Sequence, residues 1–482
     1  MSAPRLTDFV KAYDVRGLVP EQLSPQVARV IGAAFAQVIA TPEGASAIVI
    51  GHDMRPSSPE LARAFAEGAV AHGVDVTLIG LCSTDGLYYA SGALDVPGAM
   101  FTASHNPARY NGIKLCRAGA RPVGQESGLA EVRDLAQWLL DRGDLHPSIA
   151  PGRVGSITER DLLADYAAHL RGLVDLSAAR PLKVVVDAGN GMAGHTVPAV
   201  LGTDGGMPGL PLEVVPLYFE LDGNFPNHEA NPLEPENLRD LQAAVLEHGA
   251  DLGLAFDGDA DRCFVVDETG APVPPSAVTA LVAEREVARA VADGTAAADI
   301  AVVHNLISSR AVPEIIAATG ARPVRTRVGH SYIKQEMASE NAVFGGEHSA
   351  HYYFRDFWFA DTGMLAAMHV LAALGEQQRP LSQLVASYTR YVASGEINSP
   401  VADVPAATAR VRDWATGQGG VTEDDLDGLT LTHEGEPLWW LNLRASNTEP
   451  LLRLNVEAAD RATMERVRDA ALAAIRTEGE RP

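Results

Sequence analysis

The sequence predicts an α/β protein with three similar mixed α/β-sheet domains, followed by a smaller α+β domain at the C-terminal end. Apolar, β-branched strands alternate with helical segments in three successive blocks, and each strand runs into a polar or glycine-containing loop. Beyond about residue 375 this alternation gives way to apolar runs typical of antiparallel strands. At 482 residues, the chain is also too long for one ordinary hydrophobic core.

The first block, predicted over residues 1–150, contains the strands Ala47–Ile50, Val74–Ile79 and Gly98–Thr102. The first strand runs into a Gly-His-Asp loop, which is typical of a strand that leads into a crossover helix. A helix is therefore expected from about Ser58. The block ends at the Pro- and Gly-containing segment HPSIAPGR, whose composition is typical of a linker.

The second and third blocks repeat the same pattern over residues 151–270 and 271–372. The second opens at Pro181 with an apolar β-branched run that enters a glycine-rich turn, and it closes with the strand LGLAF after Asp251. The third contains the strand Ile300–Leu306. Because the same pattern recurs in all three blocks, although without obvious sequence identity between them, we expect three related α/β domains.

The last region, residues 373–482, has a different pattern of elements. Helices are expected at Leu381–Tyr391 and at Arg461–Arg476, and the runs TLTHEG, LWWLNLRAS and EPLLRLNVEA between them predict antiparallel strands. This region is therefore expected to form a separate α+β domain that moves more freely than the others.

Composition and charge exclude several classes of function. The formal charge of −24 argues against nucleic acid as a partner, because phosphate-backbone binding requires clustered basic residues. The sequence has no stretch of roughly 18 apolar residues and no signal-peptide pattern, which predicts a cytoplasmic protein without membrane contact. The widely spaced Cys82, Cys116 and Cys263 fit a reducing compartment and are expected to be small buried hydrophobes.

The first candidate for catalysis is Ser104, in the segment Thr102-Ala-Ser-His-Asn-Pro107. It follows a predicted strand directly, and open α/β sheets bind ligands at the carboxyl ends of their strands. Downstream, the alternation of a short strand puts Lys114 on the face opposite Ile113 and Leu115, from which it could point back at Ser104. Standing alone, the serine segment would be interpreted as an ordinary polar turn, and Lys114 as a solvated surface lysine.

The second candidate is a metal loop, Asp257-Gly-Asp-Ala-Asp261, which follows the strand LGLAF. Three carboxylates at alternate positions of a tight turn can converge on one hard cation such as Mg²⁺. A calcium loop of the EF-hand kind is the alternative, since Glu268 falls at the twelfth position of that pattern. Against calcium, Arg262 stands where that loop needs glycine, and a strand follows where a helix should begin.

Two further polar segments lie after predicted strands. In Gly345-Gly-Glu-His-Ser-Ala-His351, the side chains of Glu347 and Ser349 could bind vicinal sugar hydroxyls, and His351 could move protons near neutral pH. Between two strands of the last region, Arg444 offers a bidentate fork, and the turn after it offers the further donors that a phosphate monoester requires. These donors are Ser446, Asn447 and Thr448.

Taken together, these segments resemble the α-D-phosphohexomutase superfamily over the whole chain. The segments AYDVRG, TASHNP, DGDADR, GEHSAH and RASNTEP look like its phosphomannomutase/phosphoglucomutase branch. That similarity implies four domains around a central cleft, the first three alike in topology. It implies an enzyme that interconverts hexose 1-phosphate and hexose 6-phosphate, with Mg²⁺ as its metal and a hexose 1,6-bisphosphate as activator and intermediate.

The resemblance also implies roles for individual residues. Ser104 is expected to be the phosphoserine and a metal ligand together with Asp257, Asp259 and Asp261, while Arg262 lies beside the reacting oxygen. Lys114 and His351 are expected to handle protons, and Arg16, which faces the cleft, is expected to be a further catalytic residue. The expected contacts to the hexose phosphate are Tyr13, His330, Lys334, Glu347, Ser349, Arg444, Ser446, Asn447 and Thr448.

One position departs from the family pattern. Ile307 stands where many members carry a basic residue that meets the ligand, and His304, Asn305 or Arg310 are the candidates to replace that contact. Two alternatives to a mannose or glucose phosphomutase stay open at this point. They are a phosphoglucosamine mutase, and a non-catalytic protein that binds calcium or a sugar phosphate. A monomer or a homodimer is expected.

Overall fold

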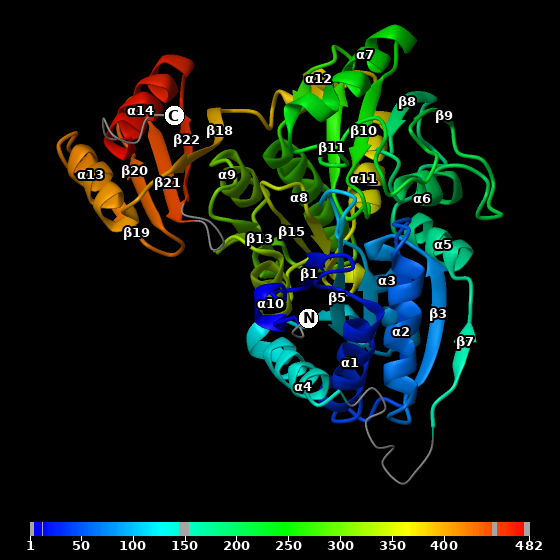
Figure 1. Ribbon diagram of the computed structural model, residues 1–482. Helices are drawn as coiled ribbons and strands as arrows, with labels where there is room; N and C mark the ends of the chain where they lie inside the picture. Colours follow the sequence, from blue (N-terminus) through cyan, green and yellow to red (C-terminus); the bar gives the residue numbers. More distant parts are fainter. Residues whose placement is uncertain (1–3, 12, 144–153, 446–450, 477–482) are drawn as a thin grey trace.

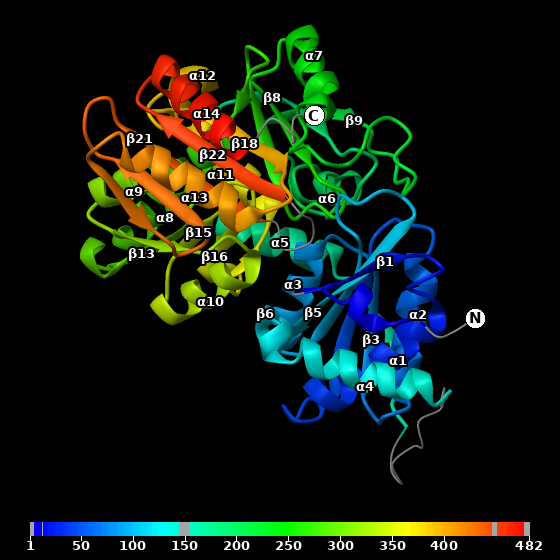
Figure 2. The same cartoon turned by 60° about the vertical axis from the view of Figure 1, so that its left-hand side comes forward.

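The computed structural model describes residues 4–11, 13–143, 154–445 and 451–476. It divides the chain into four units, each built on its own β-sheet (Figure 1). We number them domains 1 to 4 in chain order. Domain 4, orange and red in Figures 1 and 2, stands to one side and joins the rest through the extended segment that begins β18.

The first three sheets share one strand order, which confirms the prediction of three related mixed-sheet domains followed by a smaller α+β domain. Counted along each domain, five strands lie in the order 5-4-3-1-2. The pairs 1–2 and 1–3 are parallel, and the pairs 3–4 and 4–5 are antiparallel. Domain 1 adds one strand at each side of this core sheet.

The strands of the core sheets follow in chain order. Domain 1 has β2 (Ala47–His52), β3 (Asp75–Leu81), β4 (Gly98–Phe101), β5 (Tyr110–Arg117) and β6 (Arg121–Pro122), with β1 (Val15–Leu18) and β7 (Ile157–Glu159) added. Domain 2 has β8 (Leu182–Asp187), β9 (Leu212–Leu217), β10 (Leu252–Phe256), β11 (Cys263–Asp267) and β12 (Pro272–Val273). Domain 3 has β13 (Ala301–Asn305), β14 (Arg322–Thr326), β15 (Phe344–Gly346), β16 (Tyr352–Phe354) and β17 (Ala360–Asp361).

Helices connect these strands. They are α1 (Pro25–Phe35), α2 (Ser58–Val70), α3 (Thr84–Leu94), α4 (Leu129–Asp141), α5 (Leu163–Leu173), α6 (Ala193–Val200), α7 (Arg239–His248), α8 (Pro275–Ala292), α9 (Ala311–Ala318), α10 (His330–Glu340), α11 (Gly363–Gly375) and α12 (Leu381–Val385). None of the helices among the described residues is both long enough and apolar enough to cross a membrane.

Domain 4 is an antiparallel sheet with two further helices. Its strands lie in the order β18 (Val392–Pro400), β22 (Leu451–Ala458), β21 (Trp439–Ala445), β20 (Leu429–His433) and β19 (Val421–Asp424), and its helices are α13 (Val404–Thr416) and α14 (Arg461–Ile475). The domain has a hydrophobic core of its own, whereas the cores of domains 2 and 3 merge into one cluster. Domain 4 is therefore the unit whose position depends least on apolar packing against its neighbours.

The repeated topology decides where the polar loops meet. In each of domains 1 to 3, the loop between the third and the fourth strand carries one of the motifs singled out from the sequence. Ser104 lies between β4 and β5, the three aspartates lie between β10 and β11, and Glu347 to His351 lie between β15 and β16. Equivalent loops of three related domains thus face one another.

Candidate active site

The Ser104 loop begins where β4 ends and holds its serine in an unusual backbone conformation. Ser104 has φ +48°, in the left-handed region, where a residue with a side chain costs roughly 1–2 kcal/mol. Its N–H donates to Thr102 Oγ1 at 2.9 Å. This conformation directs the hydroxyl across the domain boundary, where Ser104 Oγ donates to Asp257 Oδ2 at 2.8 Å.

The loop between β10 and β11 gathers three carboxylates in one place. Asp257, Asp259 and Asp261 are buried, and each offers a carboxylate oxygen within 4.8 Å of those of the other two. Burial and the neighbouring carboxylates raise the pKa of Asp257 to about 7, although Arg262 lowers it. The Oδ1 atoms of Asp259 and Asp261 have no hydrogen-bond partner among the described residues. Buried, unpartnered carboxylate oxygens of this kind suit a hard divalent cation, so these residues fit Mg²⁺.

The structure does not support the calcium-loop alternative. The five residues after Arg262 form β11, where an EF-hand would begin its second helix. Glu268, which would supply the twelfth-position ligand, instead accepts hydrogen bonds from the N–H of Ser382, at 3.0 Å, and from its hydroxyl.

Two cations balance this acidic cluster. Lys114 Nζ lies 2.7 Å from Asp259 Oδ2 and 2.6 Å from Asp261 Oδ2. Burial lowers the pKa of Lys114, but the two carboxylates outweigh it and hold that pKa well above its usual value. Arg262 Nε donates to Asp257 Oδ2 at 2.9 Å. Both side chains therefore remain charged beside the Ser104 hydroxyl.

His105, the residue after the serine, stays neutral at this site. Arg262 Nη2 donates to His105 Nδ1 at 2.6 Å, and Ser104 Oγ lies 3.2 Å from the same nitrogen. Burial, with the charges of Arg262 and Arg16, holds the pKa of His105 well below its usual value. Arg16 approaches from the same side, where its Nη1 donates to Asn106 Oδ1 at 2.5 Å.

The loop between β15 and β16 forms a hydrogen-bonded chain that ends at the acidic cluster. Tyr353 OH donates to Glu347 Oε1 at 2.5 Å, and Ser349 Oγ lies 3.3 Å from Glu347 Oε2 and 3.0 Å from His351 Nδ1. His351 Nε2 lies 3.5 Å from Asp261 Oδ1. Burial lowers the pKa of His351, but Asp261 and Glu347 outweigh it, so the net direction is upward.

The start of α10 supplies the remaining predicted contacts of domain 3. His330 packs edge-on against Tyr13, with ring centroids 5.1 Å apart, and burial with the charge of Lys334 lowers its pKa to about 4. Lys334 itself is buried. Its Nζ pairs with Asp361 Oδ1 at 2.6 Å and lies 4.0 Å from the Tyr88 ring centroid, so its charge is already matched within the protein.

A pocket of about 310 Å³ lies where these loops meet. The predicted residues of domains 1 to 3 that do not line it are Asp257, Asp259, Lys334, Glu347 and Ser349. The predicted residues that line it are Tyr13, Arg16, Ser104, Lys114, Asp261, Arg262, His330 and His351. It is also lined by residues that sequence reasoning did not select, namely Lys11, Asp14, Tyr88, His105 and Asp361. His105 stood inside a recognised motif, whereas Tyr88 and Asp361 carry no local signal and reach the pocket only through the fold.

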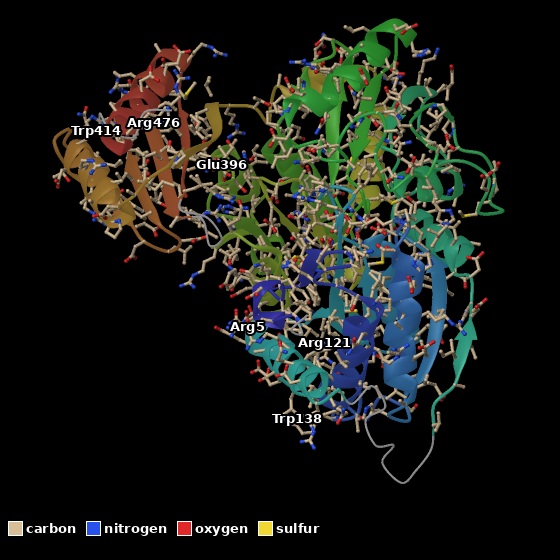
Figure 3. The ribbon with its side chains drawn as sticks, viewed as in Figure 1. Arg5, Arg121, Trp138, Glu396, Trp414 and Arg476 are labelled. Atoms are coloured by element: carbon tan, nitrogen blue, oxygen red, sulfur yellow. The ribbon has the colours of Figure 1, made fainter. Side chains whose placement is uncertain are left out.

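Domain 4 holds its predicted phosphate-binding arginine outside this pocket. Arg444, at the end of β21, lies between two carboxylates, with its Nη2 3.7 Å from Glu396 Oε2 and its Nη1 3.6 Å from Asp427 Oδ2. Figure 3 labels Glu396 on β18, on the side of domain 4 that faces domain 3. Ser446, Asn447 and Thr448 lie outside the described residues.

Ile307 lines a cavity of about 170 Å³ between domains 3 and 4, together with His348 and Trp440. Of the candidates to replace the missing basic residue, His304 is buried and bonds the carbonyl of Asn305 at 3.0 Å, and Arg310 pairs with Glu314 and Glu434. None of the three candidates, His304, Asn305 and Arg310, lines the pocket.

Comparison with known proteins identifies the same four units. Models of the phosphoglucomutase/phosphomannomutase alpha/beta/alpha domains I, II and III match residues 8–137, 164–270 and 274–391, and the model of the C-terminal domain matches residues 396–474. Together these models cover most of the chain.

Similar proteins align over nearly their full length. The chain is 42% identical over 457 residues to the phosphohexose mutases of Xanthomonas campestris pv. campestris, covering 94% of this chain and 96% of that protein. It is 39% identical over 456 residues to a phosphomannomutase of Escherichia coli strain K12, covering 94% and 95%. A crystal structure of a phosphoglucomutase/phosphomannomutase family protein from Burkholderia thailandensis superposes with a TM-score of 0.82 at 31% identity, covering 97% and 96%. The chain therefore belongs to the phosphoglucomutase/phosphomannomutase family.

Proposed function

We propose that this chain is a phosphohexomutase that interconverts the 1-phosphate and 6-phosphate of mannose, glucose or both through a phosphorylated Ser104. The observation that carries the proposal is the contact at 2.8 Å between Ser104 Oγ and Asp257 of the buried three-carboxylate cluster. Phosphoryl transfer requires a hydroxyl nucleophile beside a cation site. Here two basic side chains, Lys114 and Arg262, also pair with the carboxylates of that site.

In this mechanism, phospho-Ser104 gives its phosphoryl group to the free 1- or 6-hydroxyl of a bound hexose phosphate. The hydroxyl proton passes to a neighbouring base, and the Ser104 oxygen leaves as the displaced group. The resulting hexose 1,6-bisphosphate then reorients in the site and returns its other phosphoryl group to Ser104. The same bisphosphate, supplied from solution, would phosphorylate a fresh enzyme and so act as its activator.

The residues around Ser104 divide this work. Lys114, which is charged, can return a proton, and His351 can accept one when its ring is neutral. Arg262 stabilises negative charge that develops on the transferring group. Asp257, Asp259 and Asp261 would hold Mg²⁺ together with an oxygen on Ser104. When bound, this ion would offset the charge of the phosphoryl oxygens.

The substrate would be held at both ends. Glu347 and Ser349 would supply an acceptor and a donor for the sugar 3- and 4-hydroxyls, and Tyr13, Arg16 and His330 line the pocket. Lys334 would reach the substrate only by leaving its buried pair with Asp361. Arg444 would grip the phosphate that does not react, together with Ser446, Asn447 and Thr448, once domain 4 closes over the pocket. Since these groups address hydroxyls that mannose and glucose share, we expect both 1-phosphates to be converted.

The direct test is the phosphorylation state of Ser104. Intact-mass measurement after incubation with glucose 1,6-bisphosphate should find one added phosphate in the wild-type protein and none in Ser104→Ala. The variant should also lose roughly a thousandfold or more in kcat, because no other group can carry the phosphoryl. Turnover of mannose 1-phosphate or glucose 1-phosphate at near wild-type rates in Ser104→Ala would refute the proposal.

A further inference from the structure

A buried ion pair lies behind the Ser104 loop, at the end of β2. The Asp53 and Arg55 side chains are both completely buried, and Arg55 Nε lies 3.2 Å from Asp53 Oδ2. Asp53 Oδ1 also accepts from the Arg55 N–H at 3.0 Å and from Ser58 Oγ at 2.6 Å. A charged pair with no access to water is costly unless its remaining donors and acceptors are satisfied, so the partners of this pair indicate its use.

Arg55 directs the outer part of its guanidinium group at the backbone of the nucleophile loop. Its Nη2 donates to the carbonyls of Ser104 at 2.9 Å and Asn106 at 2.6 Å. Its Nη1 donates to the carbonyls of Pro107 at 3.0 Å and Tyr110 at 2.9 Å. One side chain thus holds three carbonyls of the loop between β4 and β5 and the carbonyl of the first residue of β5, a geometry that needs the planar fork of arginine.

Asp53 acts on the peptide group on the other side of Ser104. The Ser104 N–H donates to Thr102 Oγ1 at 2.9 Å, and the Thr102 hydroxyl lies close enough to the Asp53 carboxylate to lower the pKa of Asp53. The pair therefore fixes Ser104 at both ends, its N–H through Thr102 and its C=O through Arg55. A residue at φ +48° persists only where its surroundings determine its conformation, and these contacts supply that restraint.

The metal loop closes on the same carbonyl from domain 2. A Cβ atom added to Gly258 would lie 2.4 Å from the Ser104 oxygen, so the two loops are in direct backbone contact. Phe225, also from domain 2, packs its ring on the Arg55 guanidinium, with Arg55 Cζ 5.2 Å from the ring centroid. A shift of Arg55 would therefore move Ser104 relative to Asp257, with which its hydroxyl is bonded.

We propose that the Asp53–Arg55 pair is a positioning device, which holds the Ser104 backbone in its left-handed conformation and so aims the hydroxyl at the phosphoryl-transfer site. Neither residue lines the pocket, so the pair acts through Ser104 and touches no substrate. The inference rests on the proposed function. It predicts an effect on the transfer step with little effect on substrate binding.

The test compares two arginines that both hold backbone carbonyls. Arg55→Lys keeps the charge and removes the fork. Arg171→Lys is the matched control, because Arg171 Nε donates to the carbonyl of Val200 at 2.7 Å and its Nη1 to that of Pro208 at 2.6 Å, in domain 2 and away from the pocket. For each protein, kcat and KM for mannose 1-phosphate and glucose 1-phosphate, the thermal midpoint and the rate of Ser104 phosphorylation by glucose 1,6-bisphosphate are measured.

Arg55→Lys should lose about 100-fold in kcat and in the rate of Ser104 phosphorylation, because a misplacement of about 1 Å costs that much, while KM changes by less than about threefold. Arg171→Lys should lose thermal stability and keep kcat within about twofold. Free guanidinium added to Arg55→Ala should restore at least about tenfold of the lost kcat, a rescue that general destabilisation would not show.

Equal kcat values in Arg55→Lys and the wild type, or the same loss in both lysine variants, would overturn the positioning role. If Arg55→Lys does not fold, Asp53→Asn decides instead, since it weakens the hold on both ends of Ser104 and should lower kcat without raising KM; a wild-type kcat there overturns the role equally. A wild-type protein that gains no phosphate and shows no turnover would overturn the proposed function itself, which distinguishes the two failures.

Discussion

Asp85, at the start of α3, is a buried carboxylate that links three domains. It accepts hydrogen bonds from the Ser83 hydroxyl in domain 1, from Tyr166 OH in domain 2 at 2.7 Å and from Thr362 Oγ1 in domain 3 at 2.6 Å. Its neighbour Thr84 donates to Asp259 Oδ2 at 2.6 Å. Burial raises the pKa of Asp85 to about 6, although the three hydroxyl groups lower it.

This raised pKa predicts a contribution to stability that depends on pH. An unfolded aspartate has a pKa of about 3.9, so the folded protein binds more protons between that value and about 6. The contribution is fully present below pH ~4 and is lost as the pH rises through about 6. The difference corresponds to about 3 kcal/mol in the free energy of unfolding.

Asp85→Asn should remove this dependence. Urea unfolding followed by circular dichroism between pH 4 and 7 measures this dependence. Over that range the wild type should lose about 2 kcal/mol more of its unfolding free energy than the variant does. Parallel pH profiles for the two proteins would contradict the assignment.

At the scale of elements, the turn between β10 and β11 brings three carboxylates together. Mutual repulsion of their charges destabilises this arrangement unless a cation is bound, which leads to a second prediction. Chelation with EDTA should abolish mutase activity, and Mg²⁺ should restore it, because the unpartnered Oδ1 atoms of Asp259 and Asp261 then regain a cation. Asp259→Asn should behave as the metal-free wild type and gain little from added Mg²⁺. Full activity in excess chelator, measured with either hexose 1-phosphate, would refute the metal requirement.

The pairing of α1 with α2 depends on two glycines that allow a close approach of the helices. A Cβ on Gly32 would lie 2.1 Å from the carbonyl oxygen of Phe65, and one on Gly68 would lie 2.0 Å from that of Arg29. Because these partners are backbone atoms, the helices themselves would have to separate. Gly32→Ala should therefore destabilise the protein by about 1–3 kcal/mol, despite the better helix propensity of alanine.

Gly172 in α5 provides the matched control. A Cβ there meets no atom within 4 Å, so Gly172→Ala should stabilise the protein by up to about 1 kcal/mol. Differential scanning calorimetry of both variants measures the contrast. A thermal midpoint that rises equally in both would show that α1 and α2 tolerate the extra methyl group.

At the scale of the whole molecule, polar contacts connect domain 4 to domain 3. The Val328 N–H, two residues before His330, donates to Asp427 Oδ2 at 3.1 Å, and the Arg310 N–H donates to Glu457 Oε2 at 2.9 Å. Asp427 also faces Arg444 at 3.6 Å. One carboxylate thus bridges the arginine of domain 4 and the segment of domain 3 that leads into the pocket.

Asp427→Ala should loosen this bridge with little cost in stability, since partly exposed charged contacts contribute about 1 kcal/mol or less. Hydrogen exchange measured by mass spectrometry should become faster in the peptide that contains Val328, because its amide loses its acceptor. Asp425→Ala, at an exposed position of the same turn, should leave that peptide unchanged. Unaltered protection at Val328 in Asp427→Ala would show that domain 4 is held by other contacts.

Local patterns were sufficient for much of the fold. The strand predicted at Ala47–Ile50 is β2, and the helix predicted at Arg461–Arg476 is α14, because an apolar run or a 3.6-residue period reports on its own neighbours in sequence. The cysteines are buried, as predicted, and the half-buried Lys114 stands between the buried Ile113 and Leu115 on β5, as the alternation of a strand predicts. Strand β18 and helix α13 were not predicted, since β18 is mostly exposed or half-buried and carries no apolar alternation.

The sequence by itself determined which motifs matter, the family they resemble and the α/β class, since all of these are properties of short segments. Only the tertiary structure decided how the segments meet. The shared 5-4-3-1-2 strand order places three equivalent loops face to face, so that Ser104 bonds Asp257 across 153 positions of sequence. Asp361 beside Lys334, and Arg55 behind Ser104, have no signature in sequence, because a buried charge is recognised by the partners that satisfy it, and those partners are brought to it only by folding.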